Sequence, residues 1–187
     1  MKRSLLAACA ALIPAGLWAA GPEYNTDGEM LLPKGYETWV FVGSNLGLGY
    51  VEEPAPAGGP LFHNVYMETE AYLSFMETGE FPDPTQFVFE VYGAGDKEAG
   101  GELTEGQFNE GPLMSVEAAI KDSNRPVFPD SKEMWAYYFF SADDEGTPDS
   151  AARAFPDSAC WSCHDRHAGY DNVWVQFYPR LKARLGL

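Results

Sequence analysis

The chain has 187 residues with a formal net charge of −16, from 28 acidic and 12 basic side chains. This acidic balance disfavours nucleic acid and anionic membranes as partners, because like charges repel. Aromatic residues make up 14% of the sequence, and so much apolar area excludes a disordered chain. We therefore expect a folded domain whose surface attracts, if anything, a basic redox partner such as a cytochrome.

Residues 1–20 have the pattern of a cleaved secretory signal. Lys2 and Arg3 precede an apolar run over residues 5–17, and small side chains follow. The run is too short to favour a retained transmembrane helix. We expect cleavage after residue 20, which leaves a single domain over residues 21–187 with 10 basic and 28 acidic residues, a net charge of 10 − 28 = −18.

The first half of that domain reads as strands around one helix. Bulky apolar residues predict strands over 37–42, 62–67 and 86–92. Between the last two, a helix is expected from about residue 69 to Gly79, with Tyr72, Phe75 and Met76 on one face.

The strand over 86–92 separates two kinds of side chain by its alternation. One face carries Phe87, Phe89 and Val91, and the other carries Glu90 between two apolar neighbours. We expect the first face, the drier one, to point into the core. The glycine-rich segment 93–111 is expected to be an exposed loop or a long hairpin connection.

The second half continues with strands over 114–122 and 134–141. A helix is then expected to start at residues 156–158, capped by Asp157 or Ser158, and to end at Gly169. A last helix is expected from Asp171, kinked or split near Tyr178 by Pro179. Its apolar face combines side chains at fourfold spacing, namely Val173, Phe177 and Leu181.

The motif CWSCHDRH, residues 160–167, carries the chemistry. Cys-x-x-Cys-His is the attachment signature of a c-type haem, in which two thiols bond the vinyl groups and the adjacent histidine ligates iron. Cys160 and Cys163 are thus the expected attachment points and His164 the expected iron ligand.

Three other interpretations of the motif stay open. Zinc held by Cys160, Cys163 and His167 lacks a fourth ligand, because the only other histidine is the distant His63. A thiol–disulfide redox pair does not account for the adjacent histidine. A structural disulfide is disfavoured because disulfides usually close larger loops.

No methionine follows His164, so a second axial ligand has to come from earlier in the chain. His63 is expected to be a hydrogen-bonded structural residue, and His167 lies on the proximal side. The available methionines are expected to be core residues, namely Met67, Met76, Met114 and Met134. The simplest expectation is five-coordinate iron with an open distal face.

Four ordered segments together resemble the cytochrome P-460 family, which includes cytochrome c-prime-beta. They are LPKGYETWVFVGS, LFHNVYMETEAYLSFMETGEFPDPTQFVFEVY, AAIKD and CWSCHDRHAGYDNVWVQFYPRL. The resemblance implies an α+β fold, mainly an antiparallel β sheet with peripheral helices, in which a C-terminal helix carries the haem motif. It also implies a periplasmic homodimer with one five-coordinate haem c per chain, acting on hydroxylamine or binding nitric oxide.

One departure from the family pattern separates these activities. Members that oxidise hydroxylamine have a lysine bonded to the haem edge, and Phe89 stands at our best estimate of that position. Lys97 and Lys121 are the nearest lysines in sequence and are expected at the surface. Phe89, with Phe62 or Phe87 beside it, implies instead an apolar distal cap that favours nitric oxide, and the alternative that these phenylalanines are only core residues stays open.

Hydroxylamine oxidation also needs a distal base to accept protons. Glu90, Glu117 and Asp122 are candidates by location, and Glu117 is preferred because the family has a carboxylate in that neighbourhood. Three functions therefore remain open: nitric oxide binding, which the missing lysine favours, hydroxylamine oxidation, and electron transfer.

Overall fold

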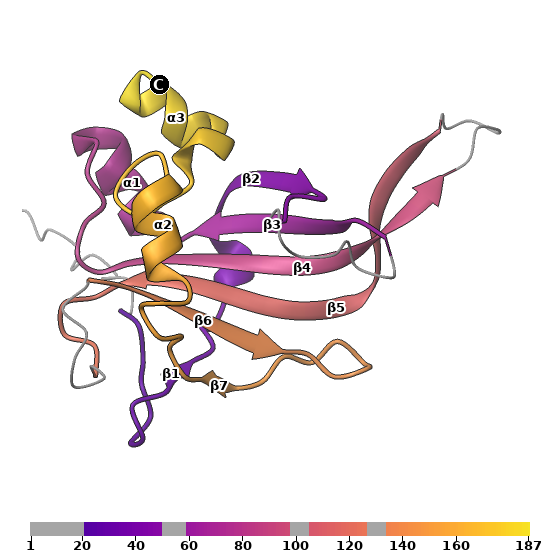
Figure 1. Ribbon diagram of the computed structural model, residues 1–187, viewed down its shortest axis with the longest axis horizontal. Coiled ribbons are helices and arrows are strands. Elements are labelled where there is room, and N and C mark those ends of the chain that lie inside the picture. The colour runs from indigo at the N-terminus through magenta and orange to yellow at the C-terminus, as the bar shows by residue number, and fades with distance from the viewer. Residues whose placement is uncertain (1–20, 50–58, 98–104, 127–133) are drawn as a thin grey trace, which may run out of the picture.

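A five-stranded antiparallel sheet forms the centre of the computed structural model, which describes residues 21–49, 59–97, 105–126 and 134–187 (Figure 1). The signal segment lies outside these residues. Each strand pairs with the next one along the chain, in the order β2 (Val40–Leu46), β3 (Leu61–Met67), β4 (Thr85–Lys97), β5 (Gly106–Lys121) and β6 (Trp135–Ser141). A second, two-stranded sheet joins β1 (Met30–Leu31) to β7 (Ala151–Ala152).

The helices and the short terminal strands cover opposite faces of the sheet. The helices are α1 (Thr69–Thr78), α2 (Trp161–His167) and α3 (Pro179–Leu185), with short 3-10 turns η1 (Tyr36–Thr38) and η2 (Val175–Phe177). In Figure 1 α1 and α3 lie toward the top of the view, α2 passes in front of β3 and β4, and β1 and β7 lie below β6. The expected α+β class is therefore confirmed.

Two apolar cores result from this arrangement. On the helix side, Phe87 of β4 packs with Phe75 of α1 and Leu181 of α3. On the opposite side, Val88 packs with residues from β1, η1 and β7. The face of β4 that carries Phe87 and Val91 is buried as expected, but the other face is buried too, because the N-terminal segment covers it.

The strand predictions hold except at their ends. The first strand begins at Val40, since Tyr36–Thr38 form η1. β4 and β5 extend past the predicted ends to Lys97 and back to Gly106, so the two ends of the glycine-rich segment 93–111 are paired strands, in agreement with the hairpin alternative. α1 ends as predicted, with Gly79 at φ 84° after its last residue.

The C-terminal helices differ more from expectation. α2 begins only at Trp161, after a turn, and neither Asp157 nor Ser158 caps it. The helix expected from Asp171 is wrong: residues 170–173 form a turn, η2 follows it, and Pro179 is the first residue of α3. Phe177 is 46% exposed, so it does not share the buried face of Leu181.

Candidate haem site

The C-terminal motif packs on the helix-covered face of the sheet. Cys160 directly precedes α2, Cys163 and His164 lie within it, and Cys160 contacts the helix-side core. The ring centroids of His164 and Tyr137, a residue of β6, are 4.1 Å apart. The long-range contact with the sheet therefore fixes the motif, since α2 is only seven residues long.

One hydrogen bond determines which nitrogen of His164 is free to ligate a metal. Nδ1 lies 2.8 Å from the backbone oxygen of Asn172, a geometry in which Nδ1–H donates to the carbonyl. Burial lowers the pKa of His164, and the bond to Asn172 opposes that shift only in part. The ring is thus a neutral imidazole whose Nε2 carries the lone pair that iron needs.

Nε2 of His164 also accepts a hydrogen bond in this structure. The indole Nε1–H of Trp174 donates to it over 3.1 Å, and the Trp174 ring stacks on Phe177 with centroids 6.0 Å apart. One lone pair cannot accept that proton and bind iron together, so iron ligation requires the indole to move.

Replacing Trp174 tests this competition. Trp174→Phe is expected to keep the haem content of the protein unchanged, because the indole N–H competes for Nε2 while the phenyl ring preserves the stacking on Phe177. The measurement is the haem-to-protein ratio by absorbance. A large fall in haem content would show that Trp174 helps to hold the group.

The two cysteines fit covalent attachment better than the other interpretations. Their thiols are free and half-buried. Burial, with the charge of Glu117 and with Cys163, raises the pKa of Cys160 to about 11, whereas redox-active pairs have a lowered thiol pKa. Among the described residues, no group of three or more His, Cys, Asp or Glu side chains is arranged to hold a metal.

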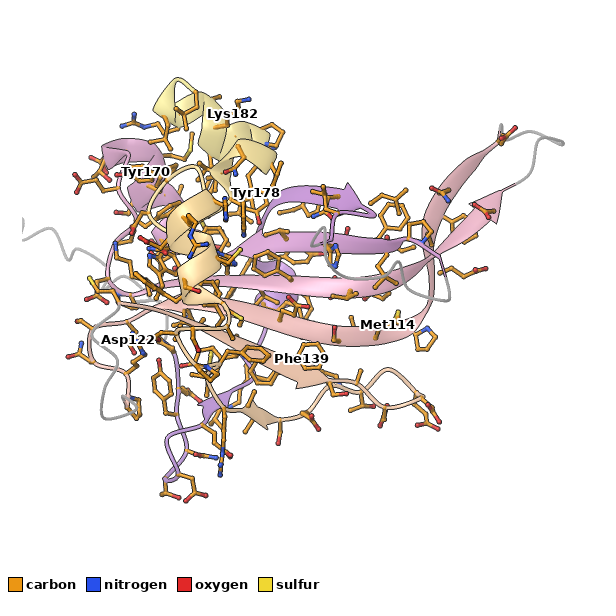
Figure 2. All side chains as sticks on the ribbon, in the orientation of Figure 1. Met114, Asp122, Phe139, Tyr170, Tyr178 and Lys182 are labelled. Atoms are coloured by element: carbon orange, nitrogen blue, oxygen red, sulfur yellow. The ribbon has the colours of Figure 1, made fainter. Side chains whose placement is uncertain are left out.

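A row of side chains crosses the sheet on the same face as the motif. Phe89 of β4 pairs with Glu117 of β5, which pairs with Phe139 of β6. The residues flanking Glu117 and Phe139 in sequence belong to the opposite core, so these two side chains face the helices. Phe139, labelled on β6 in Figure 2, is 44% exposed. This half-open apolar surface suits the face of a porphyrin.

The other two candidate pocket residues, Phe87 and Phe62, do not lie beside the motif on an open surface. Phe87 lies on the Phe89 face but is 1% exposed and packs in the core against Phe81 and Trp135. Phe62 and Tyr66 are four residues apart in β3 and therefore share one face of the sheet. Tyr66 contacts the core opposite the helices, so Phe62 lies on the face opposite Phe89. An apolar cap is therefore better assigned to Phe89 and Phe139, and sequence reasoning missed Phe139 because register alone brings it there.

The three candidate bases also differ in their position relative to the motif. Glu117 is half-buried on the motif face, and its negative charge contributes to the raised pKa of Cys160. Glu90 lies on the other face, where it accepts hydrogen bonds from Tyr36 and Tyr66 over 3.2 and 3.1 Å. Asp122 directly follows the last residue of β5 and accepts one from Tyr24 over 3.0 Å (Figure 2). Of the three, only Glu117 lies beside the motif.

Lys121 is not a surface residue, contrary to expectation. Its side chain is 13% exposed and forms a 2.8 Å ion pair with Asp171. Ion pairing explains how an ammonium group is accommodated at this depth. The side chain of Lys97 lies outside the described residues.

The candidate distal ligands have other roles or lie at the surface. Nδ1 of His63 is 2.8 Å from Oδ1 of Asn45, the structural role expected of it. Met67 is fully buried and Met76 packs at the edge of the same core, as predicted. Met114 and Met134 are 49% and 40% exposed, so their assignment to the core was wrong.

A neutral histidine whose Nε2 is an unprotonated acceptor, two free thiols beside it and a half-open aromatic surface together fit a haem site on a β sheet. The profile of the family described as Cytochrome P460 matches residues 33–175. The chain thus belongs to this family, as its four segments predicted, and is a haem cytochrome. A search among curated proteins gives no match.

Proposed function

We propose that this chain is a periplasmic mono-haem c-type cytochrome, working as a homodimer, that binds nitric oxide at five-coordinate iron. Cys160 and Cys163 would form the thioether bonds and His164 would hold the iron through Nε2. When bound, the haem supplies an iron that takes a small nitrogen species as ligand or accepts electrons from it.

The identity of the residue at position 89 is the observation that carries the choice of nitric oxide. β4 presents Phe89 on the motif face where hydroxylamine-oxidising relatives are expected to have a lysine. Lys121, the nearest lysine in sequence whose side chain is described, forms an ion pair with Asp171, which opposes a bond from its amine to the haem edge. Phe89 and Phe139 offer neutral apolar contacts, which favour an uncharged diatomic ligand over water or anions.

Glu117 supports a second candidate, hydroxylamine oxidation. It is the one candidate base on the motif face, directly between Phe89 and Phe139 in the cross-strand register. A carboxylate there is placed to accept the protons that hydroxylamine releases on oxidation.

Absorption spectra of the reduced protein with and without nitric oxide test the first proposal. A five-coordinate spectrum that changes on adding the gas supports it. A low-spin six-coordinate spectrum that resists the gas would indicate an electron-transfer cytochrome instead.

Glu117→Gln distinguishes the two candidates. Under the nitric oxide proposal, the variant keeps its affinity for the gas within a few-fold, because a neutral ligand needs no base. Under the oxidase alternative, turnover of hydroxylamine with an electron acceptor falls by about 10²–10⁴. Wild-type turnover combined with such a fall would overturn the first proposal.

A further inference from the structure

We propose that Lys121 and Asp171 act as a positioning pair that presents the backbone carbonyl of Asn172 to His164 and so sets the basicity of the iron ligand. The inference rests on His164 ligating haem iron, as proposed above. It assigns a role to an ion pair that lies outside the attachment motif.

Side chains of the sheet bind both carboxylate oxygens of Asp171. Nζ of Lys121, at the end of β5, lies 2.8 Å from Oδ2, and the indole Nε1–H of Trp135, at the start of β6, donates to Oδ1 over 3.0 Å. Lys121 also donates to the backbone oxygen of Phe81 over 3.0 Å. Two neighbouring strands therefore hold one carboxylate, with Lys121 13% and Asp171 30% exposed.

The held segment is a tight turn in an unfavourable conformation. Asp171 and Asn172 have φ of 42° and 59°, the left-handed region, which Asp and Asn tolerate better than other non-glycine residues but which still costs free energy at two successive positions. Tyr170 and Val173 close the turn with a hydrogen bond of 2.8 Å from the Val173 amide. Such a conformation persists only when its surroundings impose it.

The side chain of Asp171, and not that of Asn172, anchors the turn to the sheet. The buried side-chain oxygen of Asn172 has no hydrogen-bond partner among the described residues. Its backbone oxygen instead accepts from Nδ1 of His164 over 2.8 Å and from the hydroxyl of Tyr137 over 3.2 Å. The contacts that fix Asp171 therefore also fix the position of the adjacent Asn172 carbonyl, which is bonded to the imidazole of His164.

An acceptor on Nδ1–H makes the imidazole a stronger donor through Nε2. A stronger donor stabilises ferric iron relative to ferrous iron. Loss of the anchor lets the turn relax and the 2.8 Å bond lengthen, so the ligand becomes weaker and the reduction potential rises.

Lys121→Met tests the inference in the haem-loaded mature protein. We expect a lower iron–histidine stretching frequency in the resonance Raman spectrum of the reduced form. We also expect the reduction equilibrium to shift toward ferrous iron by about tenfold, which is about 59 mV for one electron. Lys121→Arg, which keeps the charge, is expected to restore both values in large part.

Lys34→Met is the matched control, because it breaks an exposed pair with Glu23 that is remote from the motif in the sequence. It is expected to change neither value. Asp171→Asn should shift both in the same direction as Lys121→Met, and the double variant should add little, since both act on one contact.

Variants that retain haem and lose stability, but keep the wild-type stretching frequency and potential, would overturn this inference alone and leave a purely structural ion pair. Wild-type protein without haem would overturn both this inference and the proposed function.

Discussion

Replacing both Cys160 and Cys163 with serine is expected to abolish covalent haem attachment, because a hydroxyl does not form the thioether bond. The double variant should lose all haem-dependent staining on a denaturing gel, where the wild-type band retains it. Each single variant keeps one thiol and is expected to retain reduced staining. The expected loss is complete rather than partial, since the described residues contain no further cysteine.

Ser162→Ala is the control for this experiment. Ser162 lies between the two cysteines in α2, and its hydroxyl donates to the backbone of Ser158 over 3.1 Å. Its loss leaves both thiols in place, so staining should match the wild type. Full staining of the double serine variant would refute attachment through these residues.

Phe81→Ala is expected to lower the free energy of unfolding by about 3–5 kcal/mol, the usual cost of truncating a buried phenylalanine. Phe81 is 3% exposed and stacks on Phe75 with ring centroids 4.3 Å apart. It also meets Phe87 and Trp135 edge-on at 5.6 and 6.0 Å. Truncation therefore opens a cavity among rings from α1, β4 and β6.

Chemical denaturation of the mature protein measures this effect, with Leu73→Ala as the control. Leu73 is on α1 but is 54% exposed, so its truncation should change stability by no more than about 0.5 kcal/mol. Equal losses in the two variants would contradict the assignment of Phe81 to the centre of this core.

Local patterns in the sequence were enough to predict most of the elements. Runs of bulky apolar residues locate β3, the first part of β4, and β6, and Gly79 marks the end of α1 because its left-handed conformation suits glycine. The first strand was predicted to begin at Glu37, because Glu37 and Thr38 look in sequence like an extension of the strand that follows, but they belong to η1. What distinguishes η1 is packing on the opposite face of the sheet, which no local pattern reports.

The parts of the site that were missed depend on contacts between distant segments. Lys121 and Asp171 are 50 positions apart, and a lone lysine in an acidic chain reads as solvated. Phe139 joins Phe89 only through the register of three strands. The contact of Trp174 with Nε2 of His164 depends on a turn with two left-handed residues; Asp171 and Asn172 are turn-forming residue types, but their sequence does not show which side chain the turn brings to His164.

The intact mass of the purified mature protein, expressed where haem-attachment machinery is active, tests the central claim most directly. We predict the mass of residues 21–187 plus one haem, retained after denaturation. A mass equal to that of the polypeptide alone would contradict the assignment of Cys160, Cys163 and His164 to haem.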